Sequence, residues 1–511
     1  MDDIASTRSP SALLRHRVVQ HAFSLAAAVI AAVVTVIATR RGIGLSWDST
    51  DYIAVGQTIA RYGFALDVTA LPMTIRPPGL SIAVTIGEYV GISPSVALRL
   101  LNAISIAVVV VCTDVLLRRA GVRTAARYIG VALVVVSPAL LDLTSMAWSE
   151  PPFIALAMVS LVLVTQKRTL WADLLLAGCF SALFFVRYVG VFYAAPIGLF
   201  AVVRTWRERG VVRALLRGSL IAVVSAVGPT LWLRRNYDID GTLTGYRVPG
   251  GGTLLGPLAT FTGTLGSWVL GRPPLDGNGG IYLSWSDHSA AMQTAGIVAW
   301  VAIIAIVIGA VALRKKYVGD VIGVMILLVV AYSAFSVYRF VYHEMGPLDS
   351  RMMSGLYVPL LVILVVCIDR IARTKTVARV ALVVGVVAVA SHAVQLGSDA
   401  VAYARDGRHW GSTTFQNAPI HRAIRDLGDD IALYSNEPQS LFAATMHWPV
   451  RNQYQYQLGY PRPCTDRYFV WYNQTFLPEG KPVGANVVYS DSWGEILSLG
   501  KCDEPIEKYW P

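Results

Sequence analysis

Residues 21–52 read HAFSLAAAVIAAVVTVIATRRGIGLSWDSTDY, and this stretch decides the fold. The segment 22–39 is predominantly apolar and long enough to cross about 30 Å of hydrocarbon as a helix. Asp48 and Asp51 follow soon after it, and carboxylates are costly inside a bilayer. The stretch therefore predicts a membrane helix followed by acidic groups at the membrane edge.

The composition of the whole chain agrees with a membrane protein. Of its 511 residues, 55% are hydrophobic and only 15% are charged, and the mean hydropathy is +0.53. Water-soluble globular domains do not approach these values. We predict an all-α polytopic membrane protein with about eleven transmembrane helices, at 22–39, 98–117, 128–144, 151–166, 171–186, 188–203, 215–233, 294–313, 319–341, 353–369 and 377–396.

Basic residues between these runs indicate the orientation. They gather before the first run and after the second, fourth, sixth, eighth and tenth: Arg15, Arg17, Arg118, Arg119, Arg123, Arg127, Lys167, Arg168, Arg204, Arg207, Arg209, Arg213, Arg314, Lys315, Lys316, Arg370, Arg373 and Lys375. Alternating spans bring all of them to one side, which the positive-inside rule assigns to the cytoplasm. We therefore expect a multi-pass protein of the inner (plasma) membrane with a cytoplasmic N-terminus and an exoplasmic C-terminal region.

The net charge of +11 does not indicate a nucleic-acid partner, because the positive residues lie in short loops and not in a soluble basic domain. Cys112, Cys179 and Cys367 fall inside predicted spans and are expected to be packing residues. Cys464 and Cys502 fall in the exoplasmic tail, where an oxidising compartment permits a disulfide; bridged and free states are equally compatible with the sequence.

The exoplasmic segments divide the chain into two domains. Residues 1–396 form the transmembrane module, with a first large loop at 40–97 and a second at 234–293, and residues 397–511 form a soluble α/β domain. In the first loop, helical spacing from Asp51 to Tyr62 and an apolar piece from Leu80 to Val90 predict interfacial helices. The second loop is rich in Gly and Pro and is expected to be a flexible cover. In the C-terminal domain we predict strands at 431–434, 468–472 and 486–489 and a helix near 439–446.

The two aspartates of the first loop are candidates for catalysis. A carboxylate at the edge of an apolar cavity is a natural general base, because partial desolvation raises its pKa towards the working pH. The alternative role is helix capping. For Asp51 the two roles are equally supported, whereas for Asp48 we favour catalysis.

A group of exoplasmic charges is suited to binding a phosphorylated substrate. Glu150 stands at the entry of a span, where it could cap a helix or face the protein interior. Arginine is the residue best matched to phosphate, and the candidates are Arg76, Arg187, Arg234, Arg235 and Arg351. Asp349, two residues before Arg351, joins the substrate site or forms a structural ion pair at a helix start.

Other common sites are not indicated. No cluster of His and Cys has metal-ligand spacing, no phosphate-loop lysine follows a glycine run, and no Gly-x-Ser-x-Gly element is present. Transporters more often place polar residues near the bilayer midplane, whereas the polar groups here gather at one edge.

The order and sidedness of short motifs resemble the GT-C superfamily of polytopic glycosyltransferases, especially the branch with the protein mannosyltransferases and the aminoarabinose transferase of lipid A. The matching elements are Asp48 and Asp51 ahead of an interfacial helix, Arg76-Pro77-Pro78, Trp148-Ser149-Glu150-Pro151, Arg187-Tyr188, Arg235-Asn236-Tyr237 with Gly241-Thr242-Leu243-Thr244-Gly245, Asp349-Ser350-Arg351, and the tail segment Ile431–Pro438. The resemblance covers nearly the whole chain.

This resemblance implies transfer of a sugar from a polyprenyl-phosphate carrier to an exoplasmic glycan, lipid or protein, in contact with membrane lipids. Asp48 or Asp51 would be the base, and arginines would hold the departing phosphate. Many members carry an Asp-Glu pair in the first loop, whereas Ser49 and Thr50 separate the two aspartates here, so either could act. Family members differ in their need for a divalent ion, and we expect no cofactor and no metal here.

The preference for Arg over Lys, with abundant Ala and Val, is typical of a GC-rich genome and suggests an actinobacterium, with an arabinose or mannose donor for cell-envelope glycans. Three other functions are compatible with the sequence. They are a lipid-linked substrate transporter or flippase, a non-catalytic GT-C scaffold subunit, and a ligase that moves a preassembled oligosaccharide.

Overall fold

The computed structural model describes residues 10–247, 249, 255–271, 288–312, 320–343, 349–428, 430–452, 465–473 and 481–500. Several predictions fall outside these residues: the pairing of Cys464 and Cys502 and the basic group 314–316.

The predicted spans are present as apolar helices. Six are long and apolar enough to cross a membrane: α4 (Pro94–Arg119), α9 (Val191–Arg209) with the short η1 (Tyr188–Gly190) before it, α10 (Val211–Asp240), α13 (Asp320–Tyr342), α14 (Ser350–Ile371) and α15 (Lys375–Asp406). A bent pair, α5 (Thr124–Val135) and α6 (Pro138–Thr144), makes a possible seventh span. The remaining four predicted positions hold shorter apolar helical stretches among the described residues: Ala22–Ala38 of α1 (Pro10–Ala38), α7 (Glu150–Thr165), α8 (Leu170–Val186) and Ala290–Ala305 of α12 (Ala290–Ala312). The protein is thus a multi-pass membrane protein, and the count of eleven spans stays a prediction.

Two local features of the bundle follow directly from the sequence. Pro138 has no amide hydrogen to continue α5, so the chain bends by 42° and α6 begins there, capped by the Ser137 hydroxyl, which accepts from Leu140 N. Arg187 separates α8 from η1, as the sequence predicts.

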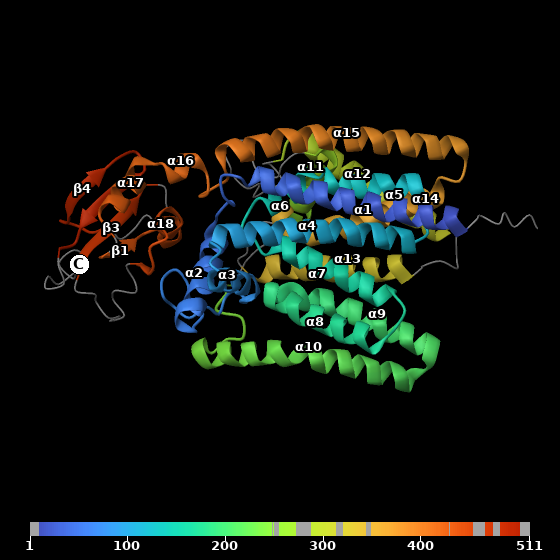
Figure 1. The fold of residues 1–511 in the computed structure, drawn as a ribbon, viewed down its shortest axis with the longest axis horizontal. Coiled ribbons are helices and arrows are strands. Elements are labelled where there is room, and N and C mark those ends of the chain that lie inside the picture. Colours follow the sequence, from blue (N-terminus) through green and yellow to red (C-terminus); the bar gives the residue numbers. More distant parts are fainter. Residues whose placement is uncertain are drawn as a thin grey trace, which may run out of the picture.

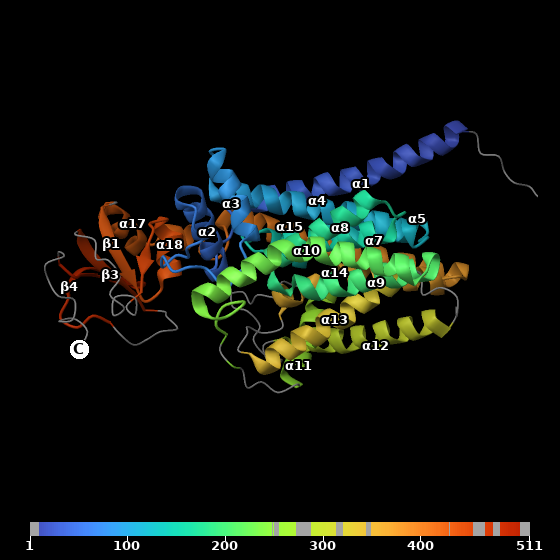
Figure 2. The same ribbon diagram turned by 90° about the horizontal axis from the view of Figure 1, so that it is seen from below.

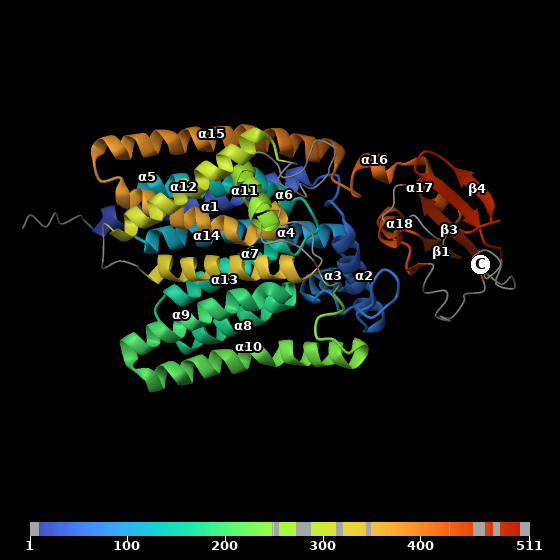
Figure 3. The same ribbon diagram turned by 180° about the vertical axis from the view of Figure 1, so that it is seen from behind.

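The helices run lengthwise beside one another, and α15 and α10 lie on opposite flanks (Figure 1, Figure 3). α1 lies opposite α11 and α12 when the bundle is seen from below (Figure 2). The core between them is apolar and includes Leu116, Phe153, Tyr193, Val324 and Leu356. α2 (Trp47–Tyr62), α3 (Gly79–Tyr89) and the C-terminal domain occupy the same end of the bundle (Figure 1).

The two helices predicted in the first loop are present. α2 (Trp47–Tyr62) ends at Gly63, whose φ of 76° a residue with a Cβ would rarely adopt. α3 (Gly79–Tyr89) begins where its backbone touches the end of α8, because a Cβ on Gly79 would lie 2.4 Å from Phe185 O. Close packing therefore fixes the first loop against the bundle.

The second large loop differs from the expected flexible cover. It contains α11 (Leu255–Leu270), an apolar helix that packs against α12. A Cβ on Gly266 would lie 1.8 Å from Met292 O, and one on Gly296 would lie 1.9 Å from Thr262 O. Gly266 and Gly296 therefore allow the backbones of the two helices to meet.

The C-terminal domain is a small α/β unit, as predicted, but with two more strands. Its strands are β1 (Ile431–Ser435), β2 (Val450–Arg451), β3 (Asp466–Tyr472), β4 (Asn486–Ser490) and β5 (Gly494–Ser498). In the sheet order β2-β1-β3-β5-β4, the first three strands are parallel and the last two are antiparallel to their neighbours. Its helices are α16 (Thr413–Gln416), α17 (Pro419–Asp426) and α18 (Pro438–Thr445). α15 continues to Asp406, past the boundary predicted at 397.

This domain packs directly on the first loop. Trp448 Nε1 donates to Asp67 O at 2.8 Å, and Val450 N donates to Val68 O at 3.1 Å. Leu441 and Phe442 of α18 share an apolar cluster with Ile53 of α2. The C-terminal domain thus supports the loop that carries the two aspartates.

Candidate functional site

Asp48 and Asp51 lie in the first turns of α2 and, being three residues apart, project from one side of the helix. The start of α2 is fixed from the bundle, because Trp148 Nε1 donates to the Ser46 hydroxyl at 2.8 Å. Behind the aspartates, Tyr52 OH and Ser149 Oγ lie 3.3 Å apart. The two carboxylates are therefore held against the N-terminal end of α7.

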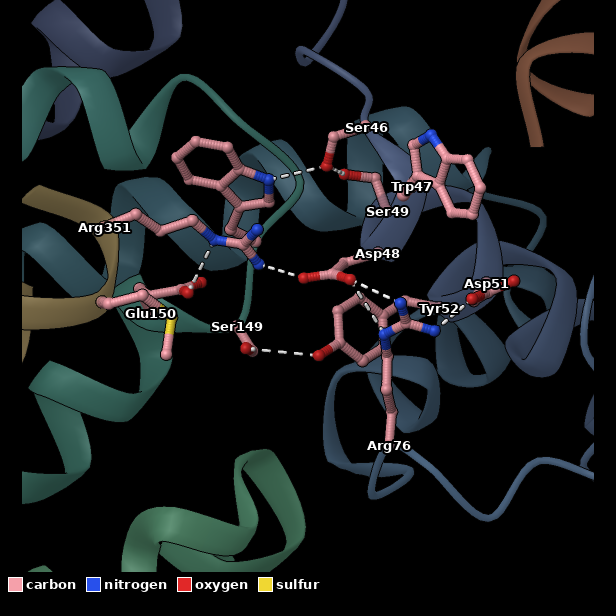
Figure 4. Close-up of polar contacts among 12 residues, drawn as sticks. Ser46, Trp47, Asp48, Ser49, Asp51, Tyr52, Arg76, Ser149, Glu150 and Arg351 are labelled. Carbon is pink, nitrogen blue, oxygen red and sulfur yellow. Dashed lines mark hydrogen bonds and ion pairs between the residues drawn. The ribbon is translucent and has the colours of Figure 1, made fainter. Parts of the chain in front are cut away.

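The charged side chains of this end form one continuous chain of ion pairs. In order of contact, its members are Asp51, Arg76, Asp48, Arg351, Glu150 and Arg187. Arg76 donates to Asp48 Oδ1 from Nη2 at 2.5 Å and from Nε at 3.0 Å, and Arg351 Nε donates to Glu150 Oε1 at 2.8 Å. Figure 4 shows Asp48 between the two arginines that contact it.

This network of ion pairs joins five parts of the fold. Its members come from α2, the loop before α3, the start of α14, the start of α7 and the α8–η1 junction. Three carboxyl groups face three guanidinium groups in it. Arg351 also stacks on the Trp148 ring, 4.4 Å from its centroid, which fixes the guanidinium plane.

A cavity of about 400 Å³ opens beside this network. Its charged lining consists of one carboxylate, Asp48, and four arginines: Arg76, Arg187, Arg247 and Arg339. The rest of the wall is largely apolar or aromatic and includes Val189, Phe192, Phe335 and Met352. Asp51, Glu150 and Arg351 are not part of the lining, and each contacts a residue that is. The cavity is therefore cationic, with a single carboxylate in its wall.

Arg247 and Arg339 were not identified from the sequence. Neither forms an ion pair with any residue that the structure describes; Arg247 Nη2 donates instead to Ile75 O at 2.7 Å. Burial lowers the pKa of Arg247, and the nearby charges of Arg339 and Arg76 lower it further. Arg339 could have been found as a lone charge within the apolar run of α13, whereas no signal marks Arg247 in the second loop.

Two predicted site residues have other contacts. Arg235 donates to Met73 O at 2.9 Å and lies 4.5 Å from the centroid of the Trp232 ring. Asp349 is the N-cap of α14, with its Oδ1 accepting from Met352 N at 2.8 Å. Neither Arg235 nor Asp349 lines the cavity, and the contacts described here hold the first loop and the start of α14 in place.

The two aspartates differ in electrostatic environment. Burial raises the pKa of Asp48, but the charges of Arg76 and Arg351 outweigh it and hold that pKa well below its usual range. Burial raises the pKa of Asp51 to about 7, with Arg76 opposing and Asp67 and Asp48 adding to the rise. At neutral pH Asp48 is therefore ionised, whereas Asp51 is partly protonated.

The acidic groups of the site are arranged for arginine and not around a metal. Among the residues that the structure describes, no group of three or more His, Cys, Asp and Glu side chains is placed to hold an ion. Asp48, Asp51 and Glu150 each contact at least one guanidinium. Metal independence remains a prediction.

Part of the chain matches a protein-family model, and nearly all of it has the fold of solved structures. Residues 70–230 match the family model of dolichyl-phosphate-mannose-protein mannosyltransferases. No curated protein matches the chain in sequence. The matched region holds Arg76, Glu150 and Arg187, and Asp48 and Asp51 precede it.

Three solved structures are similar to this chain. ArnT from Cupriavidus metallidurans bound to undecaprenyl phosphate has a TM-score of 0.61 at 13% identity, covering 92% of this chain and 96% of that one. The same protein in its apo state has a TM-score of 0.61 at 14% identity, covering 98% and 100%. The arabinofuranosyltransferase AftD from Mycobacteria has a TM-score of 0.51 at 16% identity; the match covers 94% of this chain but 40% of AftD.

The agreement with ArnT extends over nearly the full length of both chains, so it includes the membrane bundle, the first loop and the C-terminal domain. At such low sequence identity, the structural similarity shows a shared fold only. The chain therefore has the fold of ArnT and AftD, and its residues 70–230 match the family model of the dolichyl-phosphate-mannose-protein mannosyltransferases.

Proposed function

We propose that this protein is a membrane glycosyltransferase that moves a sugar from a polyprenyl-phosphate carrier to an exoplasmic acceptor, which is a glycan, lipid or protein of the cell envelope. One observation carries the proposal. Asp48 stands in the wall of a cationic cavity at the polar end of an apolar bundle, between two arginines. A sugar phosphate on a lipid anchor matches the charge of this cavity and its position at the membrane edge.

In the proposed reaction, the acceptor hydroxyl attacks the anomeric carbon of the donor. A bond forms between that carbon and the acceptor oxygen, the bond to the phosphate oxygen breaks, and the polyprenyl phosphate leaves with the bonding electron pair. The hydroxyl proton passes to Asp48. The sugar carbon develops positive charge as the phosphate leaves, and the ionised carboxylate lies on the same cavity wall.

Asp48 is the better candidate for the base, because it lines the cavity whereas Asp51 lies behind Arg76. A carboxylate held by two arginines is a weak base. A donor phosphate between Arg247 and Arg339 would bring negative charge into the same cavity, close to Arg76, and would therefore raise the pKa of Asp48. Asp48 would then become a stronger base when the donor is bound. Asp51 acts indirectly, by positioning Arg76.

The phosphate of the donor is best placed between Arg247 and Arg339. The other arginines of the site already face carboxylates, whereas these two lack an ion-pair partner among the residues that the structure describes and repel each other. A phosphate between them would remove the repulsion and accept charge-assisted hydrogen bonds. Replacing either with Gln should weaken binding of polyprenyl phosphate roughly tenfold to hundredfold. Arg234→Gln is the matched control, because its side chain is 72% exposed and pairs with Asp238.

The experiment that tests the proposal is turnover by the purified full chain in lipid with a panel of polyprenyl-phosphate sugars. Free polyprenyl phosphate should appear with at least one donor, through transfer or slow hydrolysis, and a chelator should not change the rate. A transporter or flippase would leave every donor intact while moving it across the bilayer. A non-catalytic scaffold subunit would bind no donor.

A further inference from the structure

Side chains of α8, α9 and α10 line a long apolar groove. These three helices form one flank of the bundle (Figure 1). The volume of the groove is about 630 Å³, and its lining includes Phe180 and Phe184 of α8, Leu199 and Val202 of α9, and Leu215 and Leu233 of α10. From Leu215 to Leu233 the groove follows α10 for about 27 Å, close to the thickness of the hydrocarbon layer. It shares no lining residue with the cavity that holds Asp48.

The end of this groove farthest from the C-terminal domain meets a cluster of arginines. Gly218 in the lining follows Arg217, and Val202 lies two residues before Arg204. Arg217 Nε donates to both carboxylate oxygens of Asp173 at 2.8 Å. Arg204 Nε donates to Glu208 Oε1 at 2.9 Å. Both of these guanidinium groups therefore have close acidic partners.

Arg168, in the turn between α7 and α8, is the exception in the cluster. Its side chain is only 7% exposed, and none of its three guanidinium nitrogens has a hydrogen-bond partner among the described residues. Its ion-pair contact, with Glu208 Oε2, is long at 3.9 Å, and Glu208 already pairs with Arg204. Burial lowers the pKa of Arg168 to about 10, and the neighbouring charge of Arg217 contributes.

The charges of the cluster do not balance. Three cations, Arg168, Arg204 and Arg217, face two carboxylates, Asp173 and Glu208, so three minus two leaves one positive charge. A buried guanidinium without acceptors is costly unless an anion meets it. The excess charge lies where the apolar groove ends. A ligand that satisfies both features has an anionic head and a long apolar tail.

We infer that the α8–α10 groove with Arg168 is a binding site for an anionic phospholipid of the leaflet on that side. An acyl chain lies in the groove, and the headgroup phosphate accepts hydrogen bonds from Arg168. A phospholipid is favoured over the polyprenyl donor because the arginine cluster lies at the end of the bundle opposite the Asp48 cavity. The inference does not depend on the proposed glycosyl transfer.

The test is lipid binding by the purified full chain, measured by native mass spectrometry with phosphatidylglycerol and phosphatidylcholine of identical acyl chains. The wild type should prefer phosphatidylglycerol. Arg168→Gln should reduce that preference about fivefold or more, the factor that corresponds to about 1 kcal/mol for one arginine near an anionic headgroup. Arg168→Lys should retain much of it, and Arg234→Gln, at the other end of α10, should leave it unchanged.

The groove is tested separately by Ala222→Phe, which adds a large side chain at an exposed position in the lining. Occupancy by phosphatidylglycerol should fall although all arginines remain. Equal binding of the two phospholipids by the wild type, or an unchanged preference in Arg168→Gln, would overturn the inference. Loss of undecaprenyl phosphate but not phosphatidylglycerol in Ala222→Phe would also overturn it and assign the groove to the donor tail.

Discussion

At the residue scale, Asp48 and Asp51 are one helical turn apart, but their pKa values are shifted in opposite directions. Two arginines contact Asp48 and keep it ionised, whereas Asp51 has one arginine and two neighbouring acids. Sequence reasoning found both carboxylates and the arginines that pair with the acids. The sequence could not assign different roles to Asp48 and Asp51. Their pKa values differ because two arginines contact Asp48 and one contacts Asp51, and these contacts are set by the fold.

The raised pKa of Asp51 predicts a pH-dependent stability. Its pKa is about 7 in the folded protein against an ordinary value of 3.8, so between these values the folded state binds more protons than the unfolded state. Stability contributed by this group is therefore present at low pH and is lost as the pH rises from about 4 to about 7. Asp51→Asn removes the titration and should be the more stable protein at pH 8, by on the order of 1 to 4 kcal/mol.

Thermal unfolding of wild type and Asp51→Asn between pH 4 and pH 8 measures this effect. The difference in melting temperature should grow as the pH rises and vanish near pH 4. A difference that is constant over this range would show that Asp51 does not titrate there.

At the element scale, the apolar runs and their breaks could be predicted from the sequence, but the packing between elements could not. Every predicted span is helical, although 128–144 is divided between α5 and α6, because the helix is the conformation in which an apolar run satisfies its own backbone hydrogen bonds in lipid. α11 was missed because the second loop is rich in Gly and Pro, and the close approach of Gly266 to Met292 of α12 is visible only in the fold. Strand β5 was missed because Gly494–Ser498 is short and gains its place from pairing with β3 and β4.

The close packing of α3 against the end of α8 can be tested by mutation. Gly79→Ala should push α3 away from α8, because the added Cβ would lie 2.4 Å from Phe185 O, a backbone atom that cannot move independently. We expect a loss of stability of about 1 to 3 kcal/mol and reduced turnover, since Arg76 immediately precedes this junction. Gly178→Ala in α8 is the control, because a Cβ there meets no atom within 4 Å. Equal melting temperatures of the two variants would contradict this packing.

At the scale of the whole molecule, the charged cavity, the first loop and the C-terminal domain all lie at one end of the bundle (Figure 1). The positive-inside rule assigns that end to the exoplasm and the turn between α9 and α10 to the cytoplasm. This sidedness is a prediction from the sequence, in which basic loops alternate with apolar runs along the chain. The sequence could not predict that Arg247 and Arg339 would meet, because they come from separate elements, the second loop and α13.

The orientation is tested by two matched cysteine substitutions in a variant with serine at Cys464 and Cys502. Val483→Cys in the C-terminal domain and Val212→Cys at the start of α10 have similar exposure, 68% and 66% for the parent residues. A membrane-impermeant maleimide should label Val483→Cys in intact cells and Val212→Cys only after permeabilisation. The reverse pattern would invert the topology and place the cavity on the cytoplasmic side.

The most direct test of the whole account is single-turnover release of polyprenyl phosphate by wild type, Asp48→Asn and Asp51→Asn, each in lipid with the donor that the wild type uses. We predict that Asp48→Asn loses roughly a hundredfold to ten-thousandfold in rate, the usual contribution of a general base, while its donor affinity stays within about tenfold. Asp51→Asn should keep most of the rate. A wild-type rate in Asp48→Asn, or loss of activity in Asp51→Asn alone, would contradict the assignment of Asp48 as the base in the cavity wall.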